Sequence, residues 1–398
     1  MSLLFVDDSV ASDFFPFALT RPCCELRAGA LLVRQRWETA TGESTLGFVG
    51  APHLAEFDEP GAASFFIGSV PAGTLVVNAR CAVALSEIQE GATAWTCDGR
   101  IAAVLLRSAM DVAEIAGLDG TLDSLVGPSK PAEVDGVWLD RVWDIVRHLP
   151  ALLMVDAAFL GERTERGTIA GVTTVGPHQT YIDRRASVEP MVYFDASNGP
   201  ILVRRGATVQ AFTRLVGPCV IGDNSIVGGG KIATSSIGEH CKVSGELSNT
   251  VFTGQANKGH DGFIGHSVLG RWVNLGAGTV NSNLKNNYSD VVMWTPGGLE
   301  RTGMQFLGSL LGDHVKTAIG TRLTTGGVIG SGANVYGKGI TPRYVPAFTW
   351  GLDDSDMWEL DAFLDTAARS MKRRDVPLSD KARRQLTAAW ERAREERQ

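Results

Sequence analysis

Residues 257–288 hold the densest collection of side chains that could do chemistry. The segment reads NKGHDGFIGHSVLGRWVNLGAGTVNSNLKNNY and is rich in amides, glycines and imidazoles. Imidazole takes up a proton near neutral pH, so its histidines are candidates for acid–base work. Lys258 and Lys285 could bind phosphate, although lysines are also ordinary solvated residues. The remaining amides could contact a substrate, or form turns and a ladder without any ligand: Asn281, Asn283, Asn286 and Asn287.

The sequence also indicates the scaffold that would position these groups, because an apolar residue recurs at every sixth position. One series is Val203, Val209, Leu215, Ile221 and Val227, continued by Ala233, and another is Leu311, Thr317, Leu323, Ile329 and Val335. Neither a helix nor a plain strand has this period. A triangular parallel β-helix does, because each side is a strand of about six residues whose apolar side chain stacks inside. Residues 252–263 interrupt the register and predict an extruded loop, a common place for function.

The chain on either side of the repeat has a different character. Residues 1–160 lack the six-residue step, and their short apolar runs predict an α/β domain, with an amphipathic helix over 133–153. Residues 351–398 predict helices that begin at Ser355 and Ser379 as N-caps. We therefore expect an α/β domain over 1–160, a β-helix over 161–350, and a C-terminal helical segment.

Composition narrows the function classes. Asp and Glu total 44 against 37 Lys and Arg, giving a net charge of −7, which argues against a nucleic-acid partner. No apolar run is long enough to cross a bilayer, and the first residues lack the basic start of a signal peptide. Six scattered cysteines without a C-x-x-C spacing favour neither a disulfide framework nor a zinc site. We expect a reduced cytoplasmic protein with no membrane partner.

The repeat and the 257–288 motif resemble the acetyltransferase half of the bifunctional family that makes UDP-N-acetylglucosamine. The N-terminal stretch FVDDSVASDFFPFALTRPCCELRAGALLVRQRWE resembles the opening motif of a bacterial branch of that family. That branch comprises the UDP-N-acetylglucosamine diphosphorylase/glucosamine-1-phosphate N-acetyltransferase-like proteins. The resemblance implies a sugar nucleotidyltransferase-like domain, a left-handed β-helix, and a homotrimer with acyl-CoA and sugar phosphate in clefts between neighbouring columns.

The same resemblance implies acetyl-CoA-dependent N-acetylation of an amino-sugar phosphate. The family's general base falls on His260, with Asn274 and Asn283 at the positions that hold the acyl and sugar groups. The family's Lys pair falls near Asn249, and its Arg has only Lys231 nearby, so its sugar-phosphate grip is not reproduced. Substrate contacts are expected from Lys231, Asn249, Lys258, Asp261, Phe263, Lys285 and Tyr288.

The N-terminal domain is expected to handle an NTP and a sugar 1-phosphate. The first strand is followed by acidic residues instead of the glycine-rich loop that cradles phosphates in sugar nucleotidyltransferases. Asp8 is therefore a candidate for holding Mg²⁺, or for capping a helix start. Arg21 and Arg27 are the preferred nucleotide-binding residues. An active nucleotidyltransferase, a sugar-nucleotide-binding domain and a structural platform all remain open.

Two other functions fit the same fold. One is a non-catalytic trimeric scaffold or sugar-nucleotide-binding protein. The other resembles gamma-class carbonic anhydrases, in which three histidines hold Zn²⁺ between subunits. The histidines available for such a site are His240, His260, His266 and His314. The closely spaced His pair of that family is absent, so no metal is assigned.

Overall fold

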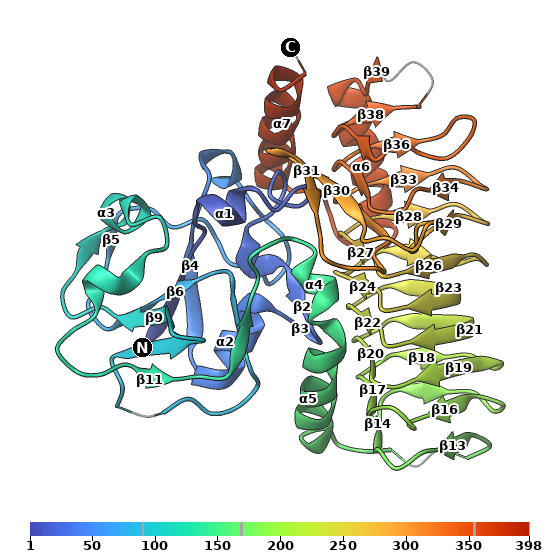
Figure 1. Ribbon diagram of the computed structural model, residues 1–398, viewed down its shortest axis with the longest axis horizontal. Coiled ribbons are helices and arrows are strands. Elements are labelled where there is room, and N and C mark those ends of the chain that lie inside the picture. The colour runs from blue at the N-terminus through green and yellow to red at the C-terminus, as the bar shows by residue number, and fades with distance from the viewer. Residues whose placement is uncertain (90, 168–169, 353–355, 398) are drawn as a thin grey trace.

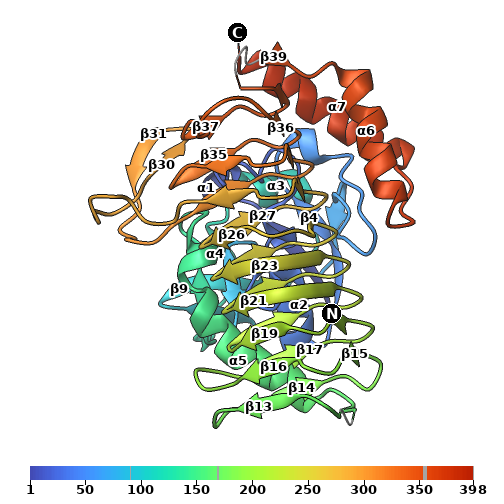
Figure 2. The same ribbon diagram turned by 90° about the vertical axis from the view of Figure 1, so that its right-hand side faces the viewer.

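The computed structural model describes residues 1–89, 91–167, 170–352 and 356–397. An α/β domain stands beside a tall column of short parallel strands, and α5 (Leu149–Glu162) runs between them (Figure 1). Two C-terminal helices, α6 (Leu360–Lys372) and α7 (Asp380–Glu395), pack at the end of the column where the last coils lie (Figure 2). These three parts confirm the predicted fold class.

The N-terminal domain is built on a mixed six-stranded sheet. Its first strand, β1 (Ser2–Val6), lies next to an edge strand and is parallel to both of its neighbours, and residues 3–6 are buried because helices and loops cover both faces. In sheet order the strands are β11 (Ala132–Glu133), β8 (Ala94–Cys97), β9 (Arg100–Leu105), β6 (Thr74–Asn78), β1 and β4 (Ser44–Val49). Short pairs flank the sheet: β2 (Arg27–Ala28) with β3 (Leu31–Leu32), β5 (Ser69–Val70) with β10 (Met110–Asp111), and β7 (Cys81–Val83) with β12 (Gly136–Trp138). The helices are α1 (Ser9–Ser12), α2 (Val33–Thr41), α3 (Val112–Gly117) and α4 (Asp144–Arg147).

The column is a left-handed parallel β-helix with three sides. The first side contains β15 (Ser187–Val188), β18 (Thr208–Val209), the starts of β21 (Ile226–Ala233) and β23 (Lys242–Ser248), β25 (Asn257–Lys258), β28 (Asn274–Leu275), β33 (Lys316–Thr317), β36 (Asn334–Val335) and β38 (Thr349–Trp350), which pairs with β39 (Asp356–Met357). The second side contains β13 (Thr173–Val175), β16 (Tyr193–Asp195), β19 (Thr213–Val216), the ends of β21 and β23, β26 (Phe263–Gly265), β29 (Val280–Asn281) and β34 (Arg322–Leu323). The third side contains β14 (Thr180–Ile182), β17 (Ile201–Val203), β20 (Cys219–Ile221), β22 (Ser236–Ile237), β24 (Val251–Phe252), β27 (Val268–Leu269), β32 (Ser309–Leu311), β35 (Gly327–Ile329) and β37 (Tyr344–Val345), and α5 packs on its first coils.

Most of the predicted inward residues are buried in the column, but the series does not run on to Ala233. Ile232 fills that slot and is fully buried, because Leu215 pairs with Ile232 one residue earlier than a full eighteen-residue coil would place it. Ala233 is partly exposed. The prediction for this one position was wrong because coils of unequal length shift the register.

The expected loop over 252–263 is not extruded. Phe252 and Ile264 are fully buried core residues, and Lys258, midway between them, occupies the inward slot and pairs with Val243. Sequence analysis read a broken register here because a lysine stands where an apolar residue was expected. The long insertion lies instead between β29 and β32 and contains the hairpin β30 (Val292–Thr295) and β31 (Gly298–Arg301).

The hairpin ties the column to the N-terminal domain. Trp294 stacks on Tyr344 with ring centroids 3.6 Å apart, and Phe15 meets the Trp294 ring edge-on at 5.5 Å. The Arg147 guanidinium donates to the Thr302 carbonyl at 2.6 Å. These contacts fix the insertion against the first domain.

Two helix predictions need correction or comment. The helix expected over 133–153 is divided, because residues 136–138 form β12 and the chain turns between α4 and α5, where Pro150 lies in the first turn of the new helix. The Ser379 hydroxyl caps α7 by accepting from the Ala382 N–H, as predicted. Ser355 lies outside the described residues, and α6 begins at Leu360.

No helix in the described part of the chain has the length and apolarity required to cross a membrane.

Candidate functional site

His260 stands at a corner between the first and second sides of the column, just after β25. Its side chain is exposed, and its carbonyl accepts a hydrogen bond from Lys258 Nζ at 2.7 Å. Lys258 Nζ also donates to the Ser244 carbonyl at 2.9 Å. Burial lowers the pKa of Lys258 to about 8, and nearby Asp261 offsets part of that shift. The corner that presents His260 is therefore held from inside the column.

A glycine completes this corner. Gly262 has φ +131°, a conformation that other residues rarely adopt, and a Cβ there would collide with the Thr279 carbonyl oxygen of the next coil. The exposed His260 and Asp261 thus sit on a tight turn with little freedom to move.

The imidazole of His260 opens onto a cavity of about 660 Å³ between the first side of the column and α6. The floor consists of outward-facing residues on successive coils, and Asn257 Nδ2 donates to Asn274 Oδ1 at 2.8 Å. The structure therefore brings two predicted catalytic residues, His260 and Asn274, to one cavity. Its polar lining is Asn224, His240, Lys242, Gln255, Asn257, His260, Asn274, Lys316, Thr366, Arg369, Ser370, Arg373 and Arg374.

Asn283 lies at a different corner, between the second and third sides. Its amide nitrogen is 2.9 Å from His266 Nδ1. Burial lowers the pKa of His266 to about 4, so the ring is neutral near pH 7 and accepts this hydrogen bond. The His266 ring also stacks on Phe306 at 5.5 Å. His266, considered above only as a zinc ligand, positions Asn283.

The two corners are separated by the width of the second side. Strand β26 runs between His260 and His266, and six extended residues span roughly 20 Å. One chain therefore cannot bring His260 and Asn283 to the same reacting atom.

A second cavity of about 660 Å³ lies beside the Asn283 corner. Its charged lining consists of Lys285, Arg322 and Arg343. Lys285 Nζ donates to Ser289 Oγ at 2.7 Å and to the Asp290 carbonyl at 3.1 Å, which folds its loop. Asn281 is buried and bonds Gly265 and Ser267 in the coil below, so it belongs to a structural amide ladder.

The remaining predicted substrate contacts are spread along the second side and its corners. Lys231 pairs with Glu246 at 3.6 Å, and both side chains are exposed. Asn249 turns a corner at φ +49° and donates to Ser248 Oγ at 3.2 Å. Phe263 lies against Gly265, beside the amide of Asn283. Tyr288, in the insertion, is 67 % exposed.

In the N-terminal domain, Asp8 caps a helix start, one of its two expected roles. Its carboxylate accepts from the Ala11 N–H at 2.9 Å and pairs with Arg80 at 2.7 Å. Both oxygens of the neighbouring Asp7 accept from the Cys23 N–H. Among the residues that the structure describes, no cluster of three His, Cys, Asp or Glu could hold a metal ion.

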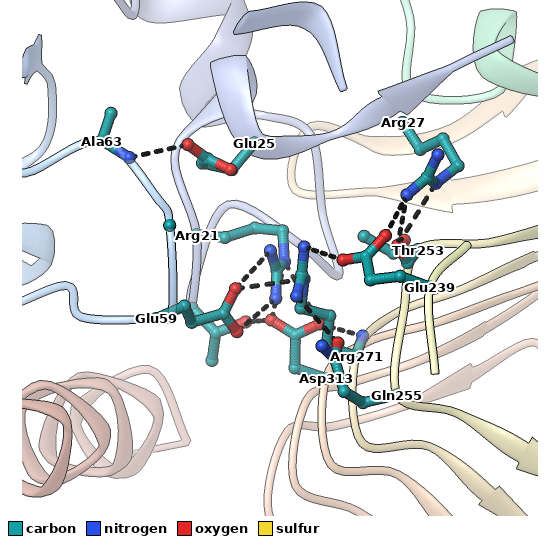
Figure 3. A network of polar contacts seen from close by, with 12 residues as sticks. Arg21, Glu25, Arg27, Glu59, Ala63, Glu239, Thr253, Gln255, Arg271 and Asp313 are labelled. Carbon is teal, nitrogen blue, oxygen red and sulfur yellow. Dashed lines mark hydrogen bonds and ion pairs between the residues drawn. The ribbon is translucent and has the colours of Figure 1, made fainter. Parts of the chain in front are cut away.

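Arg21 and Arg27, the predicted nucleotide ligands, lie in the interface between the domains (Figure 3). The buried Arg21 guanidinium is 2.9 Å from Glu59 and 2.9 Å from Asp313 of the column. Arg27 pairs with Glu239 at 2.6 Å and donates to the Thr253 carbonyl at 3.2 Å. Both guanidinium groups are already occupied by partners on the β-helix.

Arg271 of the column joins these pairs into one network. It lies 2.6 Å from Glu239 and 3.2 Å from Glu59 (Figure 3). Burial alone would raise the pKa of Glu239, but the Arg271 and Arg27 guanidiniums hold it at about 2. The network could not be predicted from sequence because the residues that pair across the domain interface are more than two hundred positions apart.

A crevice of about 390 Å³ opens at the carboxyl ends of β1 and β4, where ligands bind in open α/β sheets. Burial raises the pKa of Asp7 to about 7. The aromatic wall, Trp294 and Tyr344, comes from the hairpin and the column. The charged and titratable lining is Asp7, Asp13, His53, Arg392 and Glu396.

Comparison with known proteins matches residues 3–165 to the family described as sugar nucleotidyl transferase. The chain is 30 % identical over 183 residues to the bifunctional protein GlmU of Jannaschia sp., covering 44 % of this chain and 37 % of that protein. It is 31 % identical over 103 residues to a bifunctional sugar-1-phosphate nucleotidylyltransferase/acetyltransferase of Sulfurisphaera tokodaii, covering 26 % of each. A GlmU of Nostoc sp. is 28 % identical over 145 residues, covering 30 % of this chain and 31 % of that protein.

The matches thus span about a quarter to somewhat over a third of the length of these curated relatives. Residues 3–165 therefore match the sugar nucleotidyl transferase family, and parts of the chain are similar to several bifunctional GlmU proteins.

Proposed function

We propose that the chain is an enzyme of sugar-nucleotide biosynthesis that N-acetylates an amino-sugar phosphate with acetyl-CoA. The observation that carries this proposal is the exposed His260 in a cavity shared with Asn274. Relatives named as nucleotidylyltransferase/acetyltransferase proteins support the reaction class. All six cysteines are buried and unpaired, which fits an enzyme of the reducing cytoplasm.

The reaction needs a neutral amine and a stabilised oxyanion. His260 accepts a proton from the amine as the nitrogen attacks the thioester carbonyl carbon. The carbonyl oxygen gains charge in the tetrahedral intermediate, where an amide donor such as Asn274 or Asn283 stabilises it. The intermediate then expels the CoA thiolate, which takes the proton from His260, leaving the acetylated amine and free CoA.

The proposed assembly is a homotrimer with three shared sites. Since His260 and Asn283 lie on opposite margins of the second side, a single copy cannot use both at once. Threefold packing of parallel columns would place the His260 corner of one protomer against the Asn283 corner of the next. The acyl donor would then occupy the seam between two protomers.

A second candidate activity, nucleotidyl transfer from an NTP to a sugar 1-phosphate, rests on the family match over residues 3–165. The residues present fit a resident Mg²⁺ poorly, because Asp8 is paired with Arg80 and Asp7 accepts from a backbone N–H. We therefore assign no metal-dependent step. Pyrophosphate release should be measured with UTP, dTTP, CTP and GTP. If none of the four releases pyrophosphate, the N-terminal domain is a sugar-nucleotide-binding or structural domain.

The acetyl-transfer proposal is tested by following thiol release from acetyl-CoA with a panel of amino-sugar phosphates. His260→Ala should lower the rate by about 10²–10⁴-fold, the usual contribution of a positioned general base. His178→Ala, on the first coil, is the matched control and should retain the wild-type rate. If no acceptor consumes thioester in the wild type, the chain is better described as a non-catalytic trimeric scaffold or sugar-nucleotide-binding protein.

A further inference from the structure

The cavity beside His260 has a cationic roof supplied by α6 and the turn that follows it. Arg369 of α6 lines the cavity together with Arg373 and Arg374, which come directly after the helix, and they face Lys242 and Lys316 on the column. No Asp or Glu is among its described lining residues, although acidic residues outnumber basic ones in the whole chain. A cavity of this composition selects anions.

The roof is a fixed part of the fold. Figure 2 shows α6 beside the last coils of the column. Phe363 is buried and meets the Phe348 ring edge-on at 4.9 Å and the His314 ring at 5.8 Å. Just beyond the C-terminal end of the helix, Arg374 Nε donates to the His240 carbonyl at 3.2 Å. The arginines are therefore held over the cavity rather than carried on a free tail.

The charges of this roof are only weakly compensated. Arg369 has Asp365 at 3.7 Å, but both side chains are exposed, and pairs of this kind contribute little. Arg373 has no ion-pair or hydrogen-bond partner for its guanidinium in the described part of the chain. Lys316 Nζ donates to the Trp272 and His314 carbonyls, which leaves Lys242 and the arginines as the anion-binding groups.

We propose that this cavity binds a phosphate-bearing ligand, with Arg369 of α6 and Arg373 at its C-cap binding the phosphate above His260. The planar guanidinium suits phosphate because it can donate two parallel hydrogen bonds. This inference rests on the proposed function and assigns the phosphate-binding role that Lys231 and Asn249 do not fill. The phosphate is that of the amino-sugar acceptor or one of those of coenzyme A.

The experiment is isothermal titration calorimetry on the full chain, which requires no turnover. Ligands are an amino-sugar 1-phosphate, the same sugar without phosphate, coenzyme A and dephospho-coenzyme A. Arg373→Gln should weaken binding of at least one phosphate-bearing ligand by about ten- to a hundredfold, since a charge-assisted hydrogen bond is lost. The phosphate-free sugar should bind both proteins equally. Arg383→Gln, an exposed arginine on α7, is the matched control and should bind as wild type.

Each outcome has a defined meaning. A loss confined to the sugar phosphate identifies the acceptor, and a loss confined to coenzyme A identifies the donor. Equal affinities in wild type and Arg373→Gln for every ligand would overturn the inference. Arg373-dependent binding without acetyl transfer would defeat the proposed function and leave this inference standing. If Arg373→Gln transfers acetyl groups with an unchanged KM, this inference fails and the proposed function stands.

Discussion

Lys258 shows how one residue can join the scaffold to the site. It fills an inward slot of the column and bonds the carbonyl of His260. Phe252 and Ile264 are apolar core residues twelve positions apart, but the sequence predicted a loop between them. The core position of Lys258 could not be predicted, since in sequence a lysine looks like a solvated residue or a phosphate ligand. Only the backbone carbonyls that receive its ammonium make its burial tolerable.

At the residue scale, Lys258→Met should change the pH dependence of stability. Because burial depresses the pKa of Lys258 from 10.5 to about 8, the unfolded chain binds the proton more tightly. The free-energy cost of burying the charged Lys258 is fully present below pH 8 and disappears as pH rises toward 10.5. The free energy of unfolding of the wild type should therefore increase by on the order of 3 kcal/mol across that window because of this group.

Thermal midpoints recorded from pH 7.5 to 10 would reveal the difference. The Lys258→Met protein should lack this gain, whereas Lys338→Met, at an exposed position, should keep the wild-type profile. Parallel pH profiles for wild type and Lys258→Met would refute the assignment of a strained buried ammonium.

At the element scale, the sequence indicated which segments form strands of the column and which form the C-terminal helices. It did not indicate how these elements meet. Arg21 and Arg27 belong to a motif that suggested nucleotide binding, but their partners, Asp313 and Glu239, come from the column. Likewise, a C-terminal helix was predicted from sequence, but not that α6 would close the His260 cavity. Such pairings depend on packing between distant elements, which no local pattern encodes.

The domain interface should therefore weaken in acid in a way that Glu239→Gln removes. The Arg271 and Arg27 charges lower the pKa of Glu239 from 4.5 to about 2. Its stabilisation is present above pH 4.5 and is lost as pH falls toward 2, on the order of 3 kcal/mol in all. Glu239→Gln should be less stable at pH 7 and should lose less stability on acidification.

Thermal midpoints at pH 7, 4.5 and 3 test this expectation. Glu246→Gln is the control, because Glu246 is an exposed carboxylate paired loosely with Lys231 at 3.6 Å. If Glu239→Gln and Glu246→Gln lose the same stability at pH 7, the network in Figure 3 does not hold the domains together.

At the scale of the whole molecule, the geometry of the column separates the two predicted catalytic corners. The motif spacing placed His260 and Asn283 in one segment of sequence, and a reader of the sequence would expect them to be neighbours. In a three-sided coil they occupy opposite margins of one side. The proposed acetyl transfer therefore needs neighbouring protomers, with His260 supplied by one and Asn283 by the next.

Mixing two inactive variants measures this requirement directly. His260→Ala and Asn283→Ala proteins should each assemble at three times the chain mass of 42.5 kDa and each show little acetyl transfer. After the two are co-expressed or exchanged, a seam that joins an intact His260 to an intact Asn283 is restored in about a quarter of positions at equal mixing of a cyclic trimer. The account predicts that acetyl transfer returns to about that fraction of the wild-type rate. No recovery in mixed trimers, or a chain that stays monomeric, would contradict it.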